Sequence, residues 1–299
     1  MEQDGVVSQP VALMACIAMA LFYVAILYAP TVLIRLPPPP SFKAYMIRRF
    51  LCAVVSSILS LFISALILPV QTKESRHMFG VFGIRRDHII GKKGHSLLNF
   101  LYETVAGCGS SSLLDLSNRF LDWLSAISSN ILVWRNYVVA PLTEELVFRA
   151  CMIPLLLCGG LKTYSIILLC PIFFSLAHLN HFLEIYAKQN YRIVKAAMVI
   201  GLQLGYTVVF GSYASFLFVR TGHLLAPLVV HIYCNFMGLP VLYSQRSGIV
   251  SVTFIIGFLG FLWLLFPMTG PELYNDRIDN CSCWQRYCTW RETIRITQM

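Results

Sequence analysis

The stretch FLCAVVSSILSLFISALILPV, residues 50–70, contains no charged residue. It reaches the length of about 20 residues that a helix needs to cross the hydrocarbon core of a membrane. The stretch VALMACIAMALFYVAILYAPTVLI, residues 11–34, has the same character. Both are too long and too evenly apolar for core helices of a soluble protein. These two stretches therefore predict an integral membrane protein made of helices.

The composition of the whole chain favours the same class. Of the 299 residues, 57% are hydrophobic and 12% are charged, whereas a soluble domain carries about 25% charged residues. The net charge of +9 comes largely from short Lys and Arg clusters between apolar stretches, such as residues 33–50 and 73–93. Such clusters are usual in loops beside membrane helices. We therefore expect no nucleic-acid partner.

The apolar pattern predicts an all-α, polytopic membrane protein with about eight transmembrane helices. The candidate stretches lie near residues 11–34, 49–70, 97–113, 121–140, 144–160, 163–184, 195–219, 222–243 and 249–267. Small residues in VIGLQLGYTVVFGSYASF, residues 199–216, predict that one of these helices packs closely on a neighbour.

The chain divides by hydropathy into three regions within one membrane domain. Residues 1–120 hold the N-terminal membrane helices and their connectors. Residues 121–269 form the membrane core that carries the candidate site, and residues 270–299 form a polar tail. The four prolines at 37–40 predict a stiff, non-helical connector in the first region.

The stretch NYVVAPLTEELVFRACMIPLLL, residues 136–157, carries Glu144, Glu145 and Arg149 among apolar neighbours. An Asp or Arg at the centre of a membrane helix costs about 2.5–3.5 kcal/mol, so ionisable residues there are functional candidates. Pro141 suits a first helical turn and Thr143 suits a cap. The sequence therefore predicts a helix that begins here, with both glutamates near its positive end.

The spacing of these residues separates the two acids. Glu145 and Arg149 are four residues apart, so they can pair on one helical face. Adjacent residues point about 100° apart, and one arginine is therefore poorly placed to pair with Glu144 as well. Glu144 is then the spare carboxylate, suited to act as a general base. The alternative is a carboxylate pair that only caps a helix.

Two later stretches add donors and a second base. PIFFSLAHLNHFLE, residues 171–184, contains His178 deep in an apolar run. APLVVHIYCNFMG, residues 226–238, contains His231 and Asn235, which share one helical face because they are four residues apart. Two adjacent N–H donors can stabilise the oxyanion of a tetrahedral intermediate. The alternative for each residue is an interhelical hydrogen bond.

Elimination narrows the chemistry that this set can perform. The chain lacks H-E-x-x-H and G-x-S-x-G, and its ten cysteines show no zinc-ligand spacing. A carboxylate and His178 can together hold and deprotonate a water molecule, while His231 and Asn235 receive the charge of the carbonyl. This set suits hydrolysis of a peptide bond without a covalent intermediate, and we expect no metal and no other cofactor.

These motifs resemble one family, the type II CaaX prenyl endopeptidases or Ras-converting enzymes, which are glutamate-type intramembrane proteases. That family has the pattern E-E-x-x-x-R, F-x-x-x-H and H-x-x-x-N/D within apolar segments. The stretches that carry the resemblance are RNYVVAPLTEELVFRACMIP, FFSLAHLNHF, TVVFGSYASFLFVRTGHL and HIYCNFMG, and the matching residues are Glu144, Glu145, Arg149, Phe174, His178, His231 and Asn235. The resemblance covers roughly residues 134–240.

The resemblance implies a multi-pass protease of the endoplasmic-reticulum membrane with eight helices and a central catalytic cavity. Its substrates would be proteins with a prenylated C-terminal cysteine box, among them Ras-type GTPases, and it would remove their last three residues. The prenyl chain would partition into membrane lipid.

The same resemblance implies a role for each matching residue. Glu144 and His178 would activate the water, and His231 and Asn235 would form the oxyanion site. Glu145 and Arg149 would support the first pair. Apart from the resemblance, we expect the apolar, aromatic-rich helices around Phe173 and Phe174 to form the walls of a cavity for the prenyl chain and its cysteine.

The residues alone leave two other readings open. The ionisable side chains can line an ion or proton path in a transporter or channel. The chain lacks the paired interrupted helices that many secondary transporters have. The other reading is a membrane scaffold without catalytic activity.

Overall fold

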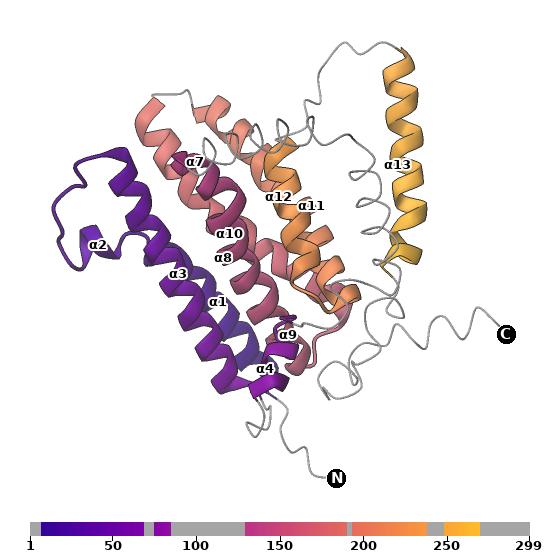
Figure 1. The fold of residues 1–299 in the computed structure, drawn as a ribbon, viewed down its shortest axis with the longest axis horizontal. Coiled ribbons are helices and arrows are strands. Elements are labelled where there is room, and N and C mark those ends of the chain that lie inside the picture. The colour runs from indigo at the N-terminus through magenta and orange to yellow at the C-terminus, as the bar shows by residue number, and fades with distance from the viewer. Residues whose placement is uncertain (1–6, 69–74, 85–128, 190–192, 238–247, 270–299) are drawn as a thin grey trace, which may run out of the picture.

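The computed structural model describes residues 7–68, 75–84, 129–189, 193–237 and 248–269. All regular elements among these residues are helices, and most lie side by side in one bundle (Figure 1). The all-α class is thereby confirmed for the part of the chain described. The helix predicted at 97–113, residues 121–128 of that predicted at 121–140, and the tail 270–299 lie outside the described residues, so the number of crossings and the three regions stay predictions.

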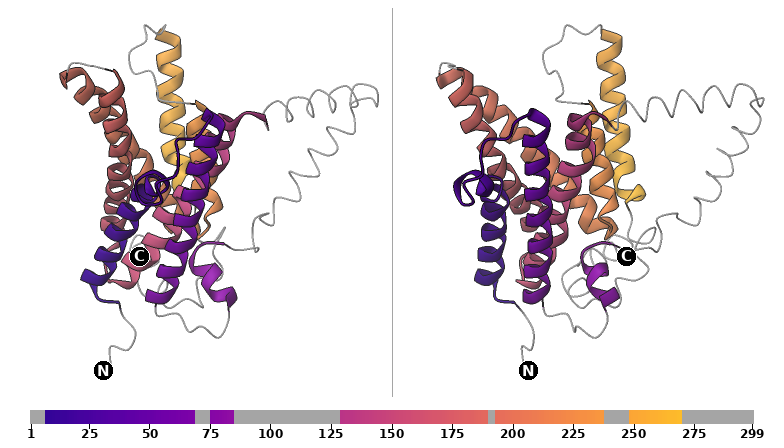
Figure 2. Two further views of the ribbon diagram at one scale, coloured as in Figure 1. Left: turned by 90° about the vertical axis from the view of Figure 1, so that its left-hand side faces the viewer. Right: turned by 60° about the vertical axis from the view of Figure 1, so that its left-hand side comes forward.

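The N-terminal part contains α1 (Gln9–Ala25), α2 (Ala29–Val32), α3 (Phe42–Ile67) and α4 (Ser75–Val81). The helix predicted over 11–34 is interrupted, because Pro30 has no N–H for the carbonyl of Ile26. Ala29 N–H donates to that carbonyl in a tighter turn instead. Helices α1 and α3 then lie along one side of the bundle (Figure 2).

Helix α3 carries its polar residues inward and its apolar residues outward. Its buried face consists of the small residues Ala53, Ser56, Ser57, Ser60 and Ser64, apart from Met46 near its start. Its exposed face carries large apolar side chains: Leu51, Val54, Val55, Ile58, Leu59, Phe62, Ile63 and Leu66. Small residues at the interface and apolar residues outside are the pattern of a helix surrounded by lipid.

Two helical segments among the described residues, Phe42–Ile67 and Gly201–Thr221, are long and apolar enough to cross a membrane. Together with the inverted pattern of α3 and the apolar composition of the chain, they indicate a membrane protein.

The centre of the bundle is one continuous helical run from Ile131 to Cys158. Its parts are α7 (Ile131–Trp134), the π-helical segment η1 (Arg135–Val139), α8 (Ala140–Glu145), the π-helical segment η2 (Leu146–Cys151) and α9 (Met152–Cys158). The prediction that a helix begins at Pro141 is therefore wrong.

Thr143 is also not a cap, because its hydroxyl donates to the carbonyl of Val139 at 2.8 Å. The two glutamates lie about four turns inside the helical run rather than in its first turn. The charge of a helix terminus therefore does not stabilise them, and their stabilisation has to come from side chains of the bundle.

Both prolines of this run follow a π-helical segment. Pro141 comes just after η1 and Pro154 just after η2. A proline inside a helix leaves one carbonyl without its backbone donor, and local π adjustments are one way in which membrane helices accommodate it. Each π segment is therefore explained by the proline that follows it.

Helices α10 (Thr163–Gln189) and α11 (Ile193–Thr221) pack against each other in antiparallel orientation. Pro171 meets Gly211, and four residues further along α10 Ser175 Oγ donates to the carbonyl of Leu204. A Cβ at Gly211 would lie 2.9 Å from Pro171 Cβ, so only glycine permits this approach. The close packing predicted for residues 199–216 is confirmed at this point.

The last described helices are α12 (Leu225–Met237) and α13 (Gly248–Met268). Helix α12 lies against the central run, where its polar residues meet those of α8. Helix α13 packs on α11 through edge-to-face contacts of Tyr213 with Phe261 and of Phe216 with Phe266. The ionisable residues of the central run are thus surrounded by residues from α1, α3, α10, α11 and α12.

Candidate functional site

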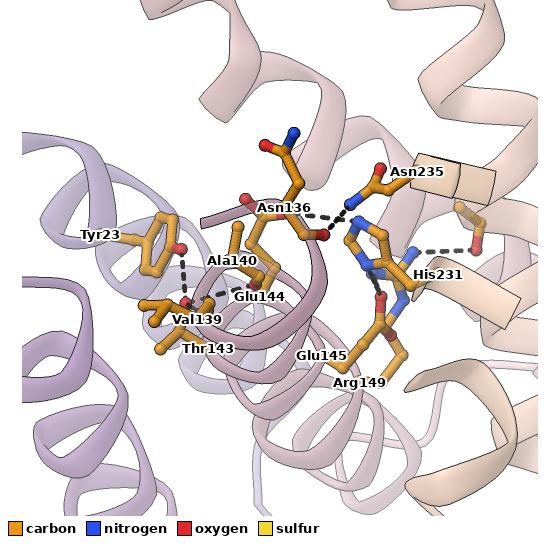
Figure 3. A network of polar contacts seen from close by, with 11 residues as sticks. Tyr23, Asn136, Val139, Ala140, Thr143, Glu144, Glu145, Arg149, His231 and Asn235 are labelled. Atoms are coloured by element: carbon orange, nitrogen blue, oxygen red, sulfur yellow. Dashed lines mark hydrogen bonds and ion pairs between the residues drawn. The ribbon is translucent and has the colours of Figure 1, made fainter. Parts of the chain in front are cut away.

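Glu145 lies at the centre of a buried cluster of charged residues. Its side chain is 0% exposed and that of Arg149 is 1% exposed. Arg149 Nη1 donates to Glu145 Oε1 at 2.9 Å (Figure 3), which confirms the predicted pair one turn apart. A bare carboxylate at this depth would be strongly unfavourable, so the guanidinium is what permits Glu145 to remain charged there.

The guanidinium of Arg149 is held from several sides. Its Nη2 donates to the carbonyl of Gly211 at 3.4 Å, and its Cζ lies 4.7 Å from the ring centroid of Phe174 and 5.9 Å from that of Phe210. The ring faces attract the cation. A Cβ at Gly211 would come within 3.2 Å of Nη2, so the glycine also makes room for this contact.

His231 on α12 connects both glutamates. Its Nδ1 lies 2.7 Å from Glu145 Oε1, and its Nε2 lies 3.6 Å from Glu144 Oε2 (Figure 3). An ionised carboxylate only accepts hydrogen bonds. His231 Nδ1 is therefore the protonated ring nitrogen, and its N–H donates a hydrogen bond to Glu145 Oε1. That bond fixes the plane of the imidazole and directs Nε2 toward Glu144.

Asn235 is held by the backbone irregularity at Pro141. In η1 the N–H of Ala140 donates to Arg135 O, five residues back. The next carbonyl in that pattern, Asn136 O, faces Pro141, which has no N–H. Asn235 Nδ2 donates to Asn136 O at 2.7 Å instead. His231 and Asn235 therefore both face the central run, as their spacing predicted.

Glu144 borders a cavity of about 660 Å³. Its side chain is 14% exposed, in contrast to the sealed Glu145. His231, Asn235 and Asn136 line the same cavity, as do Ala177 of α10 and Gln203 of α11. The cavity therefore brings the partly exposed glutamate together with the α12 pair, which come from stretches almost 90 residues apart.

A further set of hydrogen bonds holds the central run against α1 and α3. Tyr23 Oη lies 3.0 Å from Thr143 Oγ1, and Ser57 Oγ donates to Thr143 O at 3.3 Å. Tyr23 and Ser57 are not among the site residues predicted from the sequence. Nothing in the sequence marks them, because their partner is 86 or more positions away in the chain and the local patterns around them are apolar.

The other two predicted site residues lie on α10. Phe174 is 2% exposed and does not line the described cavity; its ring packs on Arg149, Phe148 and His231. Contact of Phe174 with a substrate stays a prediction. His178 is helical, one turn beyond Phe174 and next to Ala177, but its side chain lies outside the described part of the structure.

The described residues include no group of three His, Cys, Asp or Glu side chains arranged to hold a metal ion. The oxygen of Glu145 that faces His231 is already bound by the guanidinium of Arg149 at 2.9 Å. A metal ion at that oxygen would have to displace or repel a fixed cation, so the chemistry of these donors does not favour one there.

Comparison with protein families matches residues 126–237 to the family described as Type II CAAX prenyl endopeptidase Rce1-like. This range contains every site residue named above except Tyr23 and Ser57. No solved structure matches the chain significantly.

Several curated proteins named CAAX prenyl protease 2 are similar to the chain. The protein from Arabidopsis thaliana is 49% identical over 97% of this chain and 100% of its own length. That from Caenorhabditis elegans is 30% identical over 75% of this chain and 85% of its own length. That from Homo sapiens is 43% identical over 48% of this chain and 44% of its own length.

The buried pair predicts a large and specific loss of stability. Arg149→Met leaves the Glu145 carboxylate buried beside one histidine, so it should lower the free energy of unfolding by about 3–5 kcal/mol. Adding Glu145→Gln to Arg149→Met should recover most of that loss, since no unpaired charge remains. Thermal unfolding of the purified variants in detergent measures both effects.

Glu144→Gln is the matched control for this comparison. It removes the adjacent, partly exposed carboxylate, and it should change the unfolding temperature little. Equal losses for Glu144→Gln and Arg149→Met, or no recovery in the double variant, would contradict a central role of the Glu145–Arg149 pair.

Proposed function

The chain belongs to the type II CAAX prenyl endopeptidases, and from that membership we propose how its cavity hydrolyses the C-terminus of a prenylated protein. The substrate ends in a CaaX box: a cysteine with a farnesyl or geranylgeranyl group, two aliphatic residues and a last residue. Water attacks the carbonyl carbon of the cysteine, and the peptide bond between that carbonyl and the following residue breaks. The proton that the base takes from the water is passed to the leaving nitrogen, so the last three residues leave with a new amino terminus.

The observation that carries this mechanism is that Glu144, His231 and Asn235 border one cavity inside a membrane bundle. Glu144 is the partly exposed carboxylate of the pair and is therefore the one that a water molecule can reach. It takes a proton from the attacking water, and His178 holds the same water. The backbone position of His178 beside the cavity residue Ala177 supports this assignment.

The oxyanion that forms on the cysteine carbonyl is stabilised by His231 and Asn235. His231 uses Nδ1 for Glu145, so it must donate to the oxyanion from Nε2. It then donates from both ring nitrogens, from Nδ1 to Glu145 and from Nε2 to the oxyanion, whose negative charge balances that of the ring. One amide N–H of Asn235 donates to Asn136 O, and the other is available to donate to the substrate. Fixed donors of this kind stabilise a transition state without reorganisation.

Glu145, Arg149 and Phe174 act on the reaction through His231. Glu145 orients the imidazole, Arg149 neutralises Glu145, and the ring of Phe174 packs edge-on against His231 at 6.2 Å while covering Arg149. These residues position the imidazole and do not need to touch the substrate. The reaction then requires no metal ion, because a carboxylate activates the water and N–H donors receive the charge.

The membrane setting accounts for the substrate class. A prenyl chain is apolar and partitions into lipid, so it can reach a cavity that lies between membrane helices. We place the enzyme in the endoplasmic-reticulum membrane as a multi-pass protein, with Ras-type GTPases among its substrates. Membership of a protease family decides against the transporter and scaffold readings.

Glu144→Gln tests the proposed base. The amide cannot accept the proton of the attacking water, so kcat should fall by about 10²–10⁴-fold. The measurement is the release of tripeptide from a farnesylated CaaX peptide by purified enzyme in lipid nanodiscs. Leu142→Ala, an exposed residue half a turn away, is the control and should keep near-normal activity. Normal turnover by Glu144→Gln would remove Glu144 from this role.

Pro141→Ala tests whether the proline positions Asn235. The new N–H would compete for Asn136 O, so Asn235 would lose its fixed partner and kcat should fall about tenfold with little change in KM. Asn235→Ala should reduce kcat at least as much. In the Asn235→Ala background, Pro141→Ala should then have almost no additional effect. Independent, multiplicative effects of the two substitutions would contradict the link.

Chelators test the metal-free mechanism. EDTA and 1,10-phenanthroline should leave the rate of tripeptide release within about twofold of the untreated enzyme, since no step needs a Lewis acid. Strong inhibition that added zinc reverses would overturn this part of the mechanism. A non-chelating isomer of phenanthroline controls for effects on the nanodisc.

A further inference from the structure

The cavity has a second wall that the mechanism above does not use. It is formed by α1 and α3 together with the first turns of the central run, and its lining combines apolar side chains with two arginines, the tyrosines Tyr23 and Tyr45, and Asn136. The apolar members are Val24, Leu27, Phe42, Met46 and Phe50, and the arginines are Arg49 and Arg135. A wall with this composition offers apolar surface and positive charge together.

The two arginines lie at nearly the same height in the bundle. Helix α3 and the central run begin at the same end of the molecule and run in the same direction (Figure 1). The bond from Ser57 Oγ to Thr143 O aligns the two helices at that point. Arg49 precedes Ser57 by eight residues of α-helix, which corresponds to about 12 Å along the helix axis. Arg135 also precedes Thr143 by eight residues, but five of them are π-helical and rise less per residue, so its distance from the level of Thr143 is somewhat shorter.

The charges of the cavity are therefore separated by position. Glu144 follows Thr143 directly and lies close to the α12 donors, whereas both arginines lie nearer the N-terminal ends of α3 and of the central run. A carboxylate in the cavity is repelled by Glu144 and attracted by the two guanidiniums. Arg49 is further oriented by Tyr45, since its Nη1 donates to Tyr45 Oη at 2.8 Å.

The distance between these charges fits the piece that is removed. Three extended residues span at most about 10–11 Å, and the arginines lie about 12 Å from the level of Glu144 before their own side chains are counted. The released piece carries two aliphatic side chains and a terminal carboxylate. The α1 and α3 wall supplies surfaces for both.

We propose that this wall binds the last three residues of the substrate, with Arg49 and Arg135 holding the terminal carboxylate. The proposal rests on the proposed function and adds to it the part of the cavity that determines how many residues are removed. A chain bound by its terminal carboxylate presents only the bond three residues back to Glu144. The arginines thus determine specificity and take no part in the chemical step.

The test uses two farnesylated CaaX peptides that differ only at the C-terminus, one with a free carboxylate and one with a carboxamide. Wild-type enzyme should cleave the amide with about tenfold lower kcat/KM, mainly through KM, because it loses the charge-assisted contact. Arg49→Gln and Arg135→Gln should each lower kcat/KM for the acid and bring the acid-to-amide ratio toward one.

Arg48→Gln is the matched control. Arg48 is the neighbour of Arg49, but its Nη1 donates to the carbonyl of Pro37 at 2.7 Å and it does not line the cavity. It should therefore keep the acid-to-amide ratio of the wild type. A third peptide, extended by one residue beyond X, should be cleaved at the cysteine bond at least tenfold more slowly, because its carboxylate no longer meets the arginines when that bond is at Glu144.

The outcomes separate this proposal from the proposed function. Equal cleavage of acid and amide by wild-type enzyme overturns the carboxylate site, while the protease activity stands. Equal losses on both peptides in the arginine variants also overturn it, since arginines that only anchor helices at the lipid surface would give that result. Cleavage of neither peptide by wild-type enzyme refutes the proposed function itself. The comparison of wild-type enzyme on three peptides remains decisive if a variant does not fold.

Discussion

The site depends on one buried carboxylate oxygen that serves two partners. Glu145 Oε1 accepts from Arg149 on its own helix and from His231 on α12. The first bond makes the charge tolerable inside the bundle, and the second uses that charge to orient an imidazole. Removing Arg149 would leave the Glu145 charge buried without its counter-charge, which in a low dielectric is a severe loss, and removing His231 would leave that charge with no imidazole to orient. Glu145 therefore links helix packing directly to the geometry of the reacting groups.

A second constraint comes from the backbone rather than from charge. Pro141 leaves a carbonyl without an N–H partner, and Asn235 fills it from another helix. The same irregular run turns Glu144 to the cavity while Glu145 is sealed. A regular helix would satisfy Asn136 O internally, and Asn235 would then have no fixed partner. The proline is thus part of the site although it has no polar side chain.

The helical class and the Glu145–Arg149 pair are predictable from the sequence because both follow from local periodicity. The predicted roles of Pro141 and Thr143 are wrong, because in sequence a proline in the middle of a helix resembles one at its beginning. Local pattern also cannot distinguish a hydroxyl that caps a helix from one that bonds Tyr23 across the bundle. The contribution of α1 and α3 to the cavity depends entirely on tertiary contacts, and no motif in these helices indicates it.

The arrangement of the helices also explains how a hydrolytic site can lie inside a membrane protein. Hydrolysis needs charge and water, and lipid excludes both. The bundle answers this by directing apolar side chains of α3 outward and its serines inward, so that polar surface faces only the protein interior. Within that interior, acid and guanidinium groups lie at different levels of one cavity. A prenylated chain can then keep its prenyl group in the lipid while its terminal carboxylate meets guanidinium groups of opposite charge.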